Sequence, residues 1–124
     1  MKKLLLITGD IAAGKTTFSN LLSTRYNIAV FQKDTVKEIL GDHIGFQTRA
    51  ENKKLSNATM SILHHIFANI AKTGQSVIFE ANFHVEEQKQ IHAIAAENGY
   101  QVLTLVLRGN PDVLYQRYLH RMNE

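Results

Sequence analysis

Four short apolar runs recur along the chain and predict the strands of a sheet. Each is rich in branched or aromatic side chains and shows little polar alternation. Strands that are buried on both faces have this pattern, and parallel sheets flanked by helices bury both faces of their strands. We therefore expect strands, buried on both faces, at residues 4–7, 28–31, 77–79 and 102–107.

The segments between these runs have the apolar spacing of amphipathic helices. Gly74 and Gly99 lie where two of the helices would end, and Asn110 and Pro111 are typical cap and first residues of a final helix. The alternation of strands and helices predicts an open α/β sheet with right-handed crossovers. Three helices are expected before the final one, at residues 16–24, about 49–72 and 85–98.

Length and composition narrow the class of protein. The 124 residues suffice for a core, and with one proline and no repeat or linker they predict a single domain over residues 1–124. The 14 Lys and Arg and 11 Asp and Glu are scattered, so a net charge of +3 does not predict non-specific nucleic-acid binding. The absence of cysteine excludes disulfides, thiolate nucleophiles and cysteine-ligated metals. The run at residues 4–7 is too short for a signal peptide or a membrane span, so we expect a cytoplasmic protein without a membrane partner.

The strongest motif begins where the first predicted strand ends. Residues 9–16 match the phosphate-loop pattern G-x-x-x-x-G-K-S/T at every fixed position, and a predicted helix follows. In such loops successive backbone N–H groups converge on phosphate oxygens, and the positive end of the helix faces the same point. A glycine-rich structural turn is the alternative. The expected nucleotide-binding residues are Gly9, Asp10, Ala12, Ala13, Gly14, Lys15, Thr16 and Thr17.

Within this loop, two side chains have expected chemical roles. Lys15 is predicted to reach the terminal phosphates of ATP as a catalytic residue, and the Thr16 hydroxyl is predicted to bind Mg²⁺. A GTPase is excluded because the chain lacks N-K-x-D and D-x-x-G stretches after its later strands. A small kinase that transfers the γ-phosphoryl group of ATP to a hydroxyl acceptor remains.

Polar residues after the second predicted strand are the candidates for binding the acceptor of the phosphoryl group. Ligands of open α/β sheets lie outside the carboxyl ends of the strands, so Asp34 is expected in the same crevice as the phosphate loop. There its carboxylate can accept the proton of the attacking hydroxyl. Lys37, one turn on, shares that helix face and is expected to hold an anionic part of the acceptor. Alternatively, Asp34 only caps a helix that begins at Thr35.

Residues after the third strand and near the long helix complete the candidates. Glu80 is expected to hold Mg²⁺ or position the acceptor, and Asn82 to contact the acceptor, although a strand-end carboxylate and a turn residue are the simpler readings. His84 follows in the same loop. Arg49 is expected on a basic edge that recognises the acceptor; a solvated helix face is the alternative.

Two arginines and two histidines are weaker candidates. Arg117 and Arg121 are four residues apart on the final predicted helix and share a face, where a polyphosphate could lie between them. We assign Arg117 to the nucleotide and Arg121 to catalysis, with a solvated face as the alternative. His64 and His65 are adjacent and point to different faces, so no shared metal is expected, and His64 is expected to pack.

The chain resembles P-loop small-molecule kinases of the nucleoside-monophosphate-kinase-like group. It is most similar to the AAA-type kinases that include polynucleotide 5′-hydroxyl kinases, zeta-toxin-like kinases and chloramphenicol phosphotransferase. The resemblance is carried by residues 9–17, 33–37, 77–83 and 109–121, and only the first of these is highly specific.

This resemblance implies a three-layer α/β/α fold with a parallel sheet in the order 2-3-1-4, ATP with Mg²⁺, and an acceptor hydroxyl activated by Asp34. Relatives continue into a lid and a fifth strand, which we expect to be missing from this chain. The implied partners are ATP and a small-molecule hydroxyl acceptor, with a nucleic acid only as a terminal-hydroxyl acceptor. A nucleotide-binding module without phosphotransfer and a toxin-like kinase of activated sugars are the alternatives.

Overall fold

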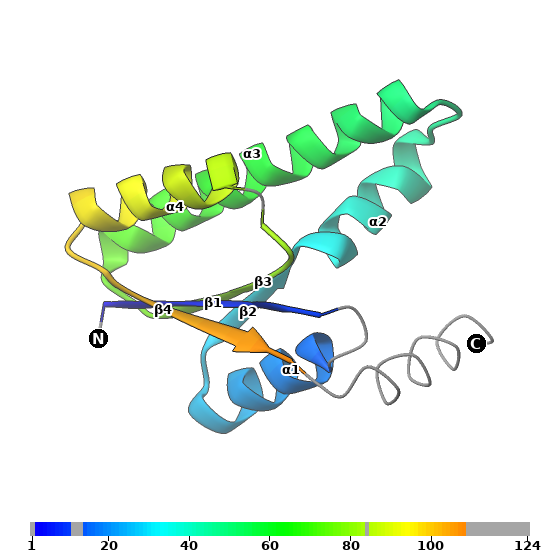
Figure 1. The fold of residues 1–124 in the computed structure, drawn as a ribbon. Coiled ribbons are helices and arrows are strands. Elements are labelled where there is room, and N and C mark those ends of the chain that lie inside the picture. Colours follow the sequence, from blue (N-terminus) through cyan, green and yellow to red (C-terminus); the bar gives the residue numbers. More distant parts are fainter. Residues whose placement is uncertain (1, 11–13, 84, 109–124) are drawn as a thin grey trace.

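Helices and strands alternate along the part of the chain that the computed structural model describes, residues 2–10, 14–83 and 85–108. Four strands and four helices are present there (Figure 1). In chain order they are β1 (Lys3–Gly9), α1 (Lys15–Tyr26), β2 (Ala29–Gln32), α2 (Lys33–Ile44), α3 (Arg49–Thr73), β3 (Val77–Glu80), α4 (Val85–Glu97) and β4 (Gln101–Leu107). The final predicted helix, from Asn110, lies outside the described residues.

The strands form one parallel sheet in the order β2-β3-β1-β4, which confirms the predicted order 2-3-1-4. Helix α1 covers one face of the sheet, and α3 and α4 cover the other (Figure 1). The fold is therefore the three-layer α/β/α arrangement that the resemblance implied. All strand ends that carry candidate residues, those of β1, β2 and β3, meet at one edge of the sheet, because the strands are parallel.

The expectation that all four strands are buried on both faces is wrong for β2 and β4. Every residue of β3 is buried, whereas β4 exposes most of its side chains and β2 has none that is fully buried. Among the described residues, β2 pairs only with β3 and β4 only with β1. The apolar runs alone cannot distinguish an edge strand from a central one, because both are rich in branched residues.

Helices α2 and α3 form a long antiparallel pair that extends beyond the sheet (Figure 1). α2 begins at Lys33, with Gln32 in the extended conformation as its N-cap. The alternative that Asp34 caps a helix starting at Thr35 is therefore wrong, since Asp34 is the second residue of α2. No helix in residues 2–10, 14–83 and 85–108 has the length and apolar character needed to cross a membrane.

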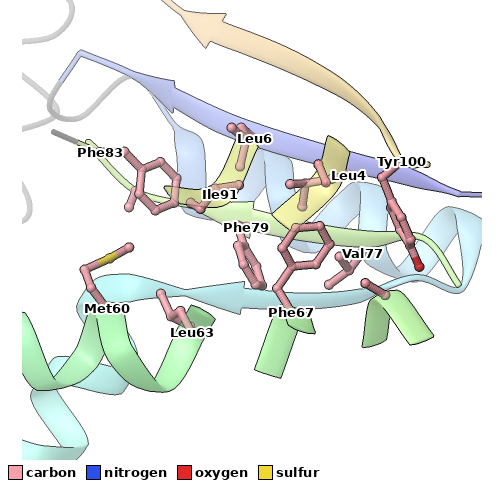
Figure 2. Close-up of a cluster of buried hydrophobic side chains, with 13 residues drawn as sticks. Leu4, Leu6, Met60, Leu63, Phe67, Val77, Phe79, Phe83, Ile91 and Tyr100 are labelled. Atoms are coloured by element: carbon pink, nitrogen blue, oxygen red, sulfur yellow. The ribbon is translucent and has the colours of Figure 1, made fainter. Parts of the chain in front are cut away.

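The core lies between the sheet and the layer formed by α3 and α4. Phe67 of α3 packs edge-on against Phe79 of β3 and against Tyr100, with ring centroids 5.8 Å and 5.5 Å apart (Figure 2). The Tyr100 hydroxyl donates to the backbone oxygen of Gln75 at 2.6 Å and also lies within hydrogen-bond distance, 3.2 Å, of the backbone oxygen of Ile70, which ties the end of α3 to the sheet. This core fixes the strand ends against which the candidate site is built.

His64 lies on α3, at the side of this core that faces α4. Its Nε2 atom is buried and has no hydrogen-bond partner among the described residues, which fits the expectation that it packs. Burial lowers the pKa of His64, and a backbone hydrogen bond with Glu87 and the charge of that carboxylate oppose the shift. Folding therefore favours the neutral form of His64 relative to the unfolded chain.

We expect His64 to make the free energy of unfolding depend on pH below about 6.5. Because its folded pKa lies below its unfolded value, the unfolded chain binds the proton first as the pH falls, and the free energy of unfolding decreases with it. Urea unfolding of the native protein and of His64→Leu between pH 5 and 8 measures this. A variant that keeps the full loss of stability at low pH would contradict the assignment.

Candidate active site

Three side chains at the carboxyl ends of β1, β3 and β2 lie in one row across the sheet. Glu80 stands in register with Ile7 on one side and Gln32 on the other. The preceding row contains Phe79 and Leu6, which belong to the core beneath α3 and α4. Side chains alternate along a strand, so Glu80 and Gln32 lie on the opposite face, the one covered by α1.

The phosphate loop leaves β1 through a backbone conformation that only glycine adopts easily. Gly9 has a φ of 136°, and a Cβ atom at this position would lie 2.0 Å from the backbone oxygen of Leu107. The same oxygen accepts a hydrogen bond from the Asp10 N–H at 3.0 Å. The first glycine of the motif is therefore required by its close approach to β4, as well as by the turn.

Among the described residues, no side chain caps the first amides of helix α1. Its N-cap is Gly14, in the left-handed conformation with φ 87°, which has no side chain to offer them. The first turn contains no acidic residue, and Thr16 and Thr17 are exposed. Helix N-termini carry partial positive charge, so these backbone N–H groups fit a phosphate that supplies the missing acceptors.

Lys15 is the first residue of α1, and its side chain reaches back to the end of β1. Its Nζ atom donates to the backbone oxygen of Gly9 at 3.0 Å. The contact holds the ammonium group close to the end of β1, where the phosphate-loop motif begins. A cation at the N-terminus of a helix is not favoured by the helix dipole, so an anion between the two would stabilise both.

Asn82 connects the phosphate loop to the segment after β3. Its Oδ1 atom accepts hydrogen bonds from the Thr8 hydroxyl at 3.2 Å and the Gly9 N–H at 3.4 Å. The Ala81 N–H also donates to the backbone oxygen of Ile7 at 3.0 Å. The structure thus places Asn82 against the end of β1, where the phosphate-loop motif begins; the predicted contact with the acceptor stays a prediction.

Glu80 is a buried carboxylate, with 6% of its surface exposed. It lies on the α1 face at the end of β3, the side of the sheet from which the phosphate-loop helix starts. A carboxylate oxygen and the Thr16 hydroxyl are ligands that Mg²⁺ accepts. Thr16 and Glu80 therefore have the residue types, and lie on the side of the sheet, that are expected of two ligands of one Mg²⁺ ion.

Asp34 and Lys37 lie on the first turns of α2, which follows directly from β2. Asp34 is exposed and Lys37 half-buried, so the Asp34 carboxylate is open to an acceptor. The structure does not bring Arg49 to this place. Arg49 begins α3 beyond the far end of α2, and the rise along α2 from Asp34 to Ile44 is about 15 Å. Arg49 would contact only an extended acceptor.

The comparisons with known proteins agree with this geometry. The family model described as Zeta toxin matches residues 1–124. The chain belongs to the zeta toxin family. No curated protein is similar enough to be counted as a relative.

Solved structures related to this zeta toxin family member include several kinases. A candidate kinase from Chloroflexus aurantiacus J-10-fl is 30% identical, with a TM-score of 0.88 over 98% of this chain and 67% of that chain. The PezAT toxin–antitoxin system of Streptococcus pneumoniae contains a chain that is 18% identical, with a TM-score of 0.73. The match covers 98% of this chain and 53% of that chain. A gluconokinase from Sinorhizobium meliloti 1021 is 12% identical, with a TM-score of 0.66 over 99% of this chain and 67% of that chain. The last two show the shared fold alone.

Sequence reasoning missed two polar contacts that hold the first turn of α2. Lys33, which is buried, pairs with Glu87 of α4 at 3.4 Å between Nζ and Oε2. The Gln32 side chain reaches α1 and contacts Ser19 and Asn20. The sequence shows only that Gln32 and Lys33 are polar residues next to Asp34 at the end of a strand. Their residue types do not reveal which helix each side chain contacts. Five candidates lie outside the described residues: Ala12, Ala13, His84, Arg117 and Arg121.

The Gly9→Ala substitution tests the loop geometry of this zeta toxin family member. The added methyl would meet the Leu107 backbone and impose a strained φ, so we expect the free energy of unfolding to fall by at least about 2 kcal/mol. Gly74→Ala is the matched control, because Gly74 also has a positive φ, 73°, in the left-handed conformation, and only the flexible Lys2 side chain lies near it, at 3.5 Å. There the expected loss is about 1 kcal/mol. Equal losses in thermal or urea unfolding would refute the close approach.

Proposed function

We propose that the protein is an ATP-dependent kinase that transfers the γ-phosphoryl group to a hydroxyl of a small molecule or nucleotide. One observation carries the proposal: the uncapped start of α1 follows a complete phosphate-loop motif at the sheet edge where β2 delivers Asp34. A site for phosphate and a carboxylate open to an acceptor thus share one edge. Membership of the zeta toxin family and the kinase neighbours support the same reaction class.

In this proposal the phosphate loop binds and orients the triphosphate. The backbone amides at the start of α1 and the Lys15 ammonium hold the β- and γ-phosphate oxygens, while Asn82 keeps Gly9 in position through its hydrogen bond. Mg²⁺, when held by the Thr16 hydroxyl and Glu80, would neutralise charge on the phosphates.

The acceptor side is assigned to the first turns of α2. Asp34 accepts the proton of the acceptor hydroxyl while the oxygen of that hydroxyl forms a bond to the γ-phosphorus. The bond between the γ-phosphorus and the β,γ-bridging oxygen breaks at the same time, and ADP leaves. Lys37, one turn along α2, would hold an anionic part of the acceptor.

The test is a transfer screen with [γ-³²P]ATP, Mg²⁺ and pools of sugars, sugar nucleotides, nucleosides and 5′-hydroxyl oligonucleotides. We expect radiolabel in an organic product with the native protein and none with Lys15→Ala. Label released only as inorganic phosphate, or appearing equally with the variant, would reject the kinase assignment.

A nucleotide-binding module without transfer is the second candidate. It is favoured by one observation: the uncapped start of α1 and the Lys15 ammonium beside Gly9 account for phosphate binding without any acceptor. Calorimetry with ATP·Mg²⁺ beside the screen distinguishes the two functions. Binding without any transfer across all pools supports the module and rejects the kinase for residues 1–124.

A further inference from the structure

The Gln32 side chain joins the two helices that bear the two halves of the proposed site. Its Nε2 atom donates to the Ser19 hydroxyl of α1 at 3.2 Å and to Asn20 Oδ1 at 3.0 Å. Its Oε1 atom accepts a hydrogen bond from the Thr35 hydroxyl of α2 at 3.2 Å. A single amide therefore bridges α1 and the first turn of α2.

The bridge continues into the phosphate loop through a buried residue. Ser19 has no exposed surface, and its hydroxyl donates to the backbone oxygen of Thr16 at 3.0 Å. Hydrogen bonds thus run without a break from Thr35, beside Asp34, through Gln32 and Ser19 to Thr16. We call these four residues the α1–α2 relay.

A second contact holds the same turn of α2 from the opposite side. Lys33 and Glu87 form an ion pair whose side chains are only 10% and 17% exposed. Because Lys33 immediately precedes Asp34, the first turn of α2 is anchored to α4 as well as to α1. The N-terminus of α2 has no side-chain cap of its own, so these anchors are what limits its fraying.

We propose that Gln32 is a positioning residue which, through Ser19, sets the place of Asp34 relative to the phosphate loop. The role of Asp34 in this inference rests on the proposed function. In-line transfer requires the acceptor oxygen within near-attack distance of the γ-phosphorus, so a shift of the α2 turn would slow transfer without weakening nucleotide binding equally. Apolar side chains would pack as well between α1 and β2 but would not fix this distance through directional bonds.

The activity test compares Gln32→Leu and Ser19→Ala with the native protein. We expect each to lower kcat by about 10-fold while the KM for ATP changes by less than about threefold, since the loop itself keeps its ligands. The double variant is expected to lose no more than Gln32→Leu alone, because both changes break one chain of bonds. Ser23→Ala is the matched control, because Ser23 lies one turn further along α1 and its hydroxyl donates to the backbone oxygen of Ile28, outside the relay. This variant is expected to keep its activity within about twofold.

Hydrogen exchange tests the same inference without any transfer reaction. The amides of Val36 and Lys37 close the first turn of α2, because they donate to the carbonyls four residues earlier. In Gln32→Leu we expect these two amides to exchange about 10-fold faster, with the exchange of the Leu63 amide of α3 unchanged. If Gln32→Leu does not fold, Thr35→Val cuts the relay at an exposed position and carries the same expectation.

The two arms distinguish failure of the inference from failure of the proposed function. If the native protein transfers no phosphate, the proposed kinase function is rejected. The hydrogen-exchange experiment still decides whether the relay holds α2 in place. Unchanged exchange, full kcat in Gln32→Leu, or additive losses in the double variant would each overturn the positioning role.

Discussion

Asp34→Asn is expected to lower kcat for phosphotransfer by about 100-fold or more while changing the affinity for ATP by less than about twofold. The amide keeps the size of the carboxylate but cannot take the proton of the acceptor hydroxyl, and general-base groups contribute about 10²–10⁴-fold to rate. Asp34 is exposed at the start of α2 and lies outside the phosphate loop, so we expect nucleotide binding to be retained. Single-turnover transfer and calorimetry with ATP·Mg²⁺ measure the two quantities.

Asp42→Asn is the matched control for this experiment. Asp42 lies on the same helix and is also exposed, but it is two turns further from the sheet edge. Its activity should remain within about twofold of the native value. Full transfer by Asp34→Asn, or equal losses in the two variants, would remove Asp34 from the role of general base.

Lys15→Ala is expected to weaken ATP binding by about 10–100-fold and to abolish detectable transfer. Hydrogen bonds to charged groups contribute about 1.5–3 kcal/mol, and Lys15 stands at the start of α1, where the phosphates are proposed to bind. The Gly9 carbonyl that now accepts from Lys15 would lose that partner, so unfolding must be measured alongside binding.

The control for Lys15→Ala is Lys72→Ala, which removes an exposed lysine in the last turn of α3. That turn leads into the amino end of β3, opposite the edge where the loop lies. Unchanged ATP affinity is expected there. Native-like affinity in Lys15→Ala would show that the nucleotide does not use the phosphate loop.

The strands and the open α/β class were predictable from local pattern, because apolar runs and the eight-residue loop motif are continuous in sequence. The strand order was predicted only from the family resemblance. The same patterns do not predict features that depend on residues distant in the sequence. The exposure of β4 depends on which strands flank it, and the start of α2 at Lys33 depends on how β2 ends. Neither is encoded in the residues of those segments alone.

The site divides in the same way. The roles proposed for Lys15 and Asp34 follow from motif position and strand end, and the structure places both at the expected edge. The partners of Gln32 depend on its register opposite Glu80 and on the path of α1 across the sheet. Arg49 lies at the far end of α2, because helix length sets a distance that residue type does not reveal.

Transfer from ATP labelled with ¹⁸O on its γ-phosphoryl group tests the kinase assignment most directly. The pooled acceptors are incubated with the native protein and Mg²⁺, and the products are analysed by mass spectrometry. We predict a phosphorylated acceptor that keeps its own unlabelled hydroxyl oxygen and carries the three labelled oxygens of the γ-phosphoryl group. Label confined to ATP and inorganic phosphate would contradict the account.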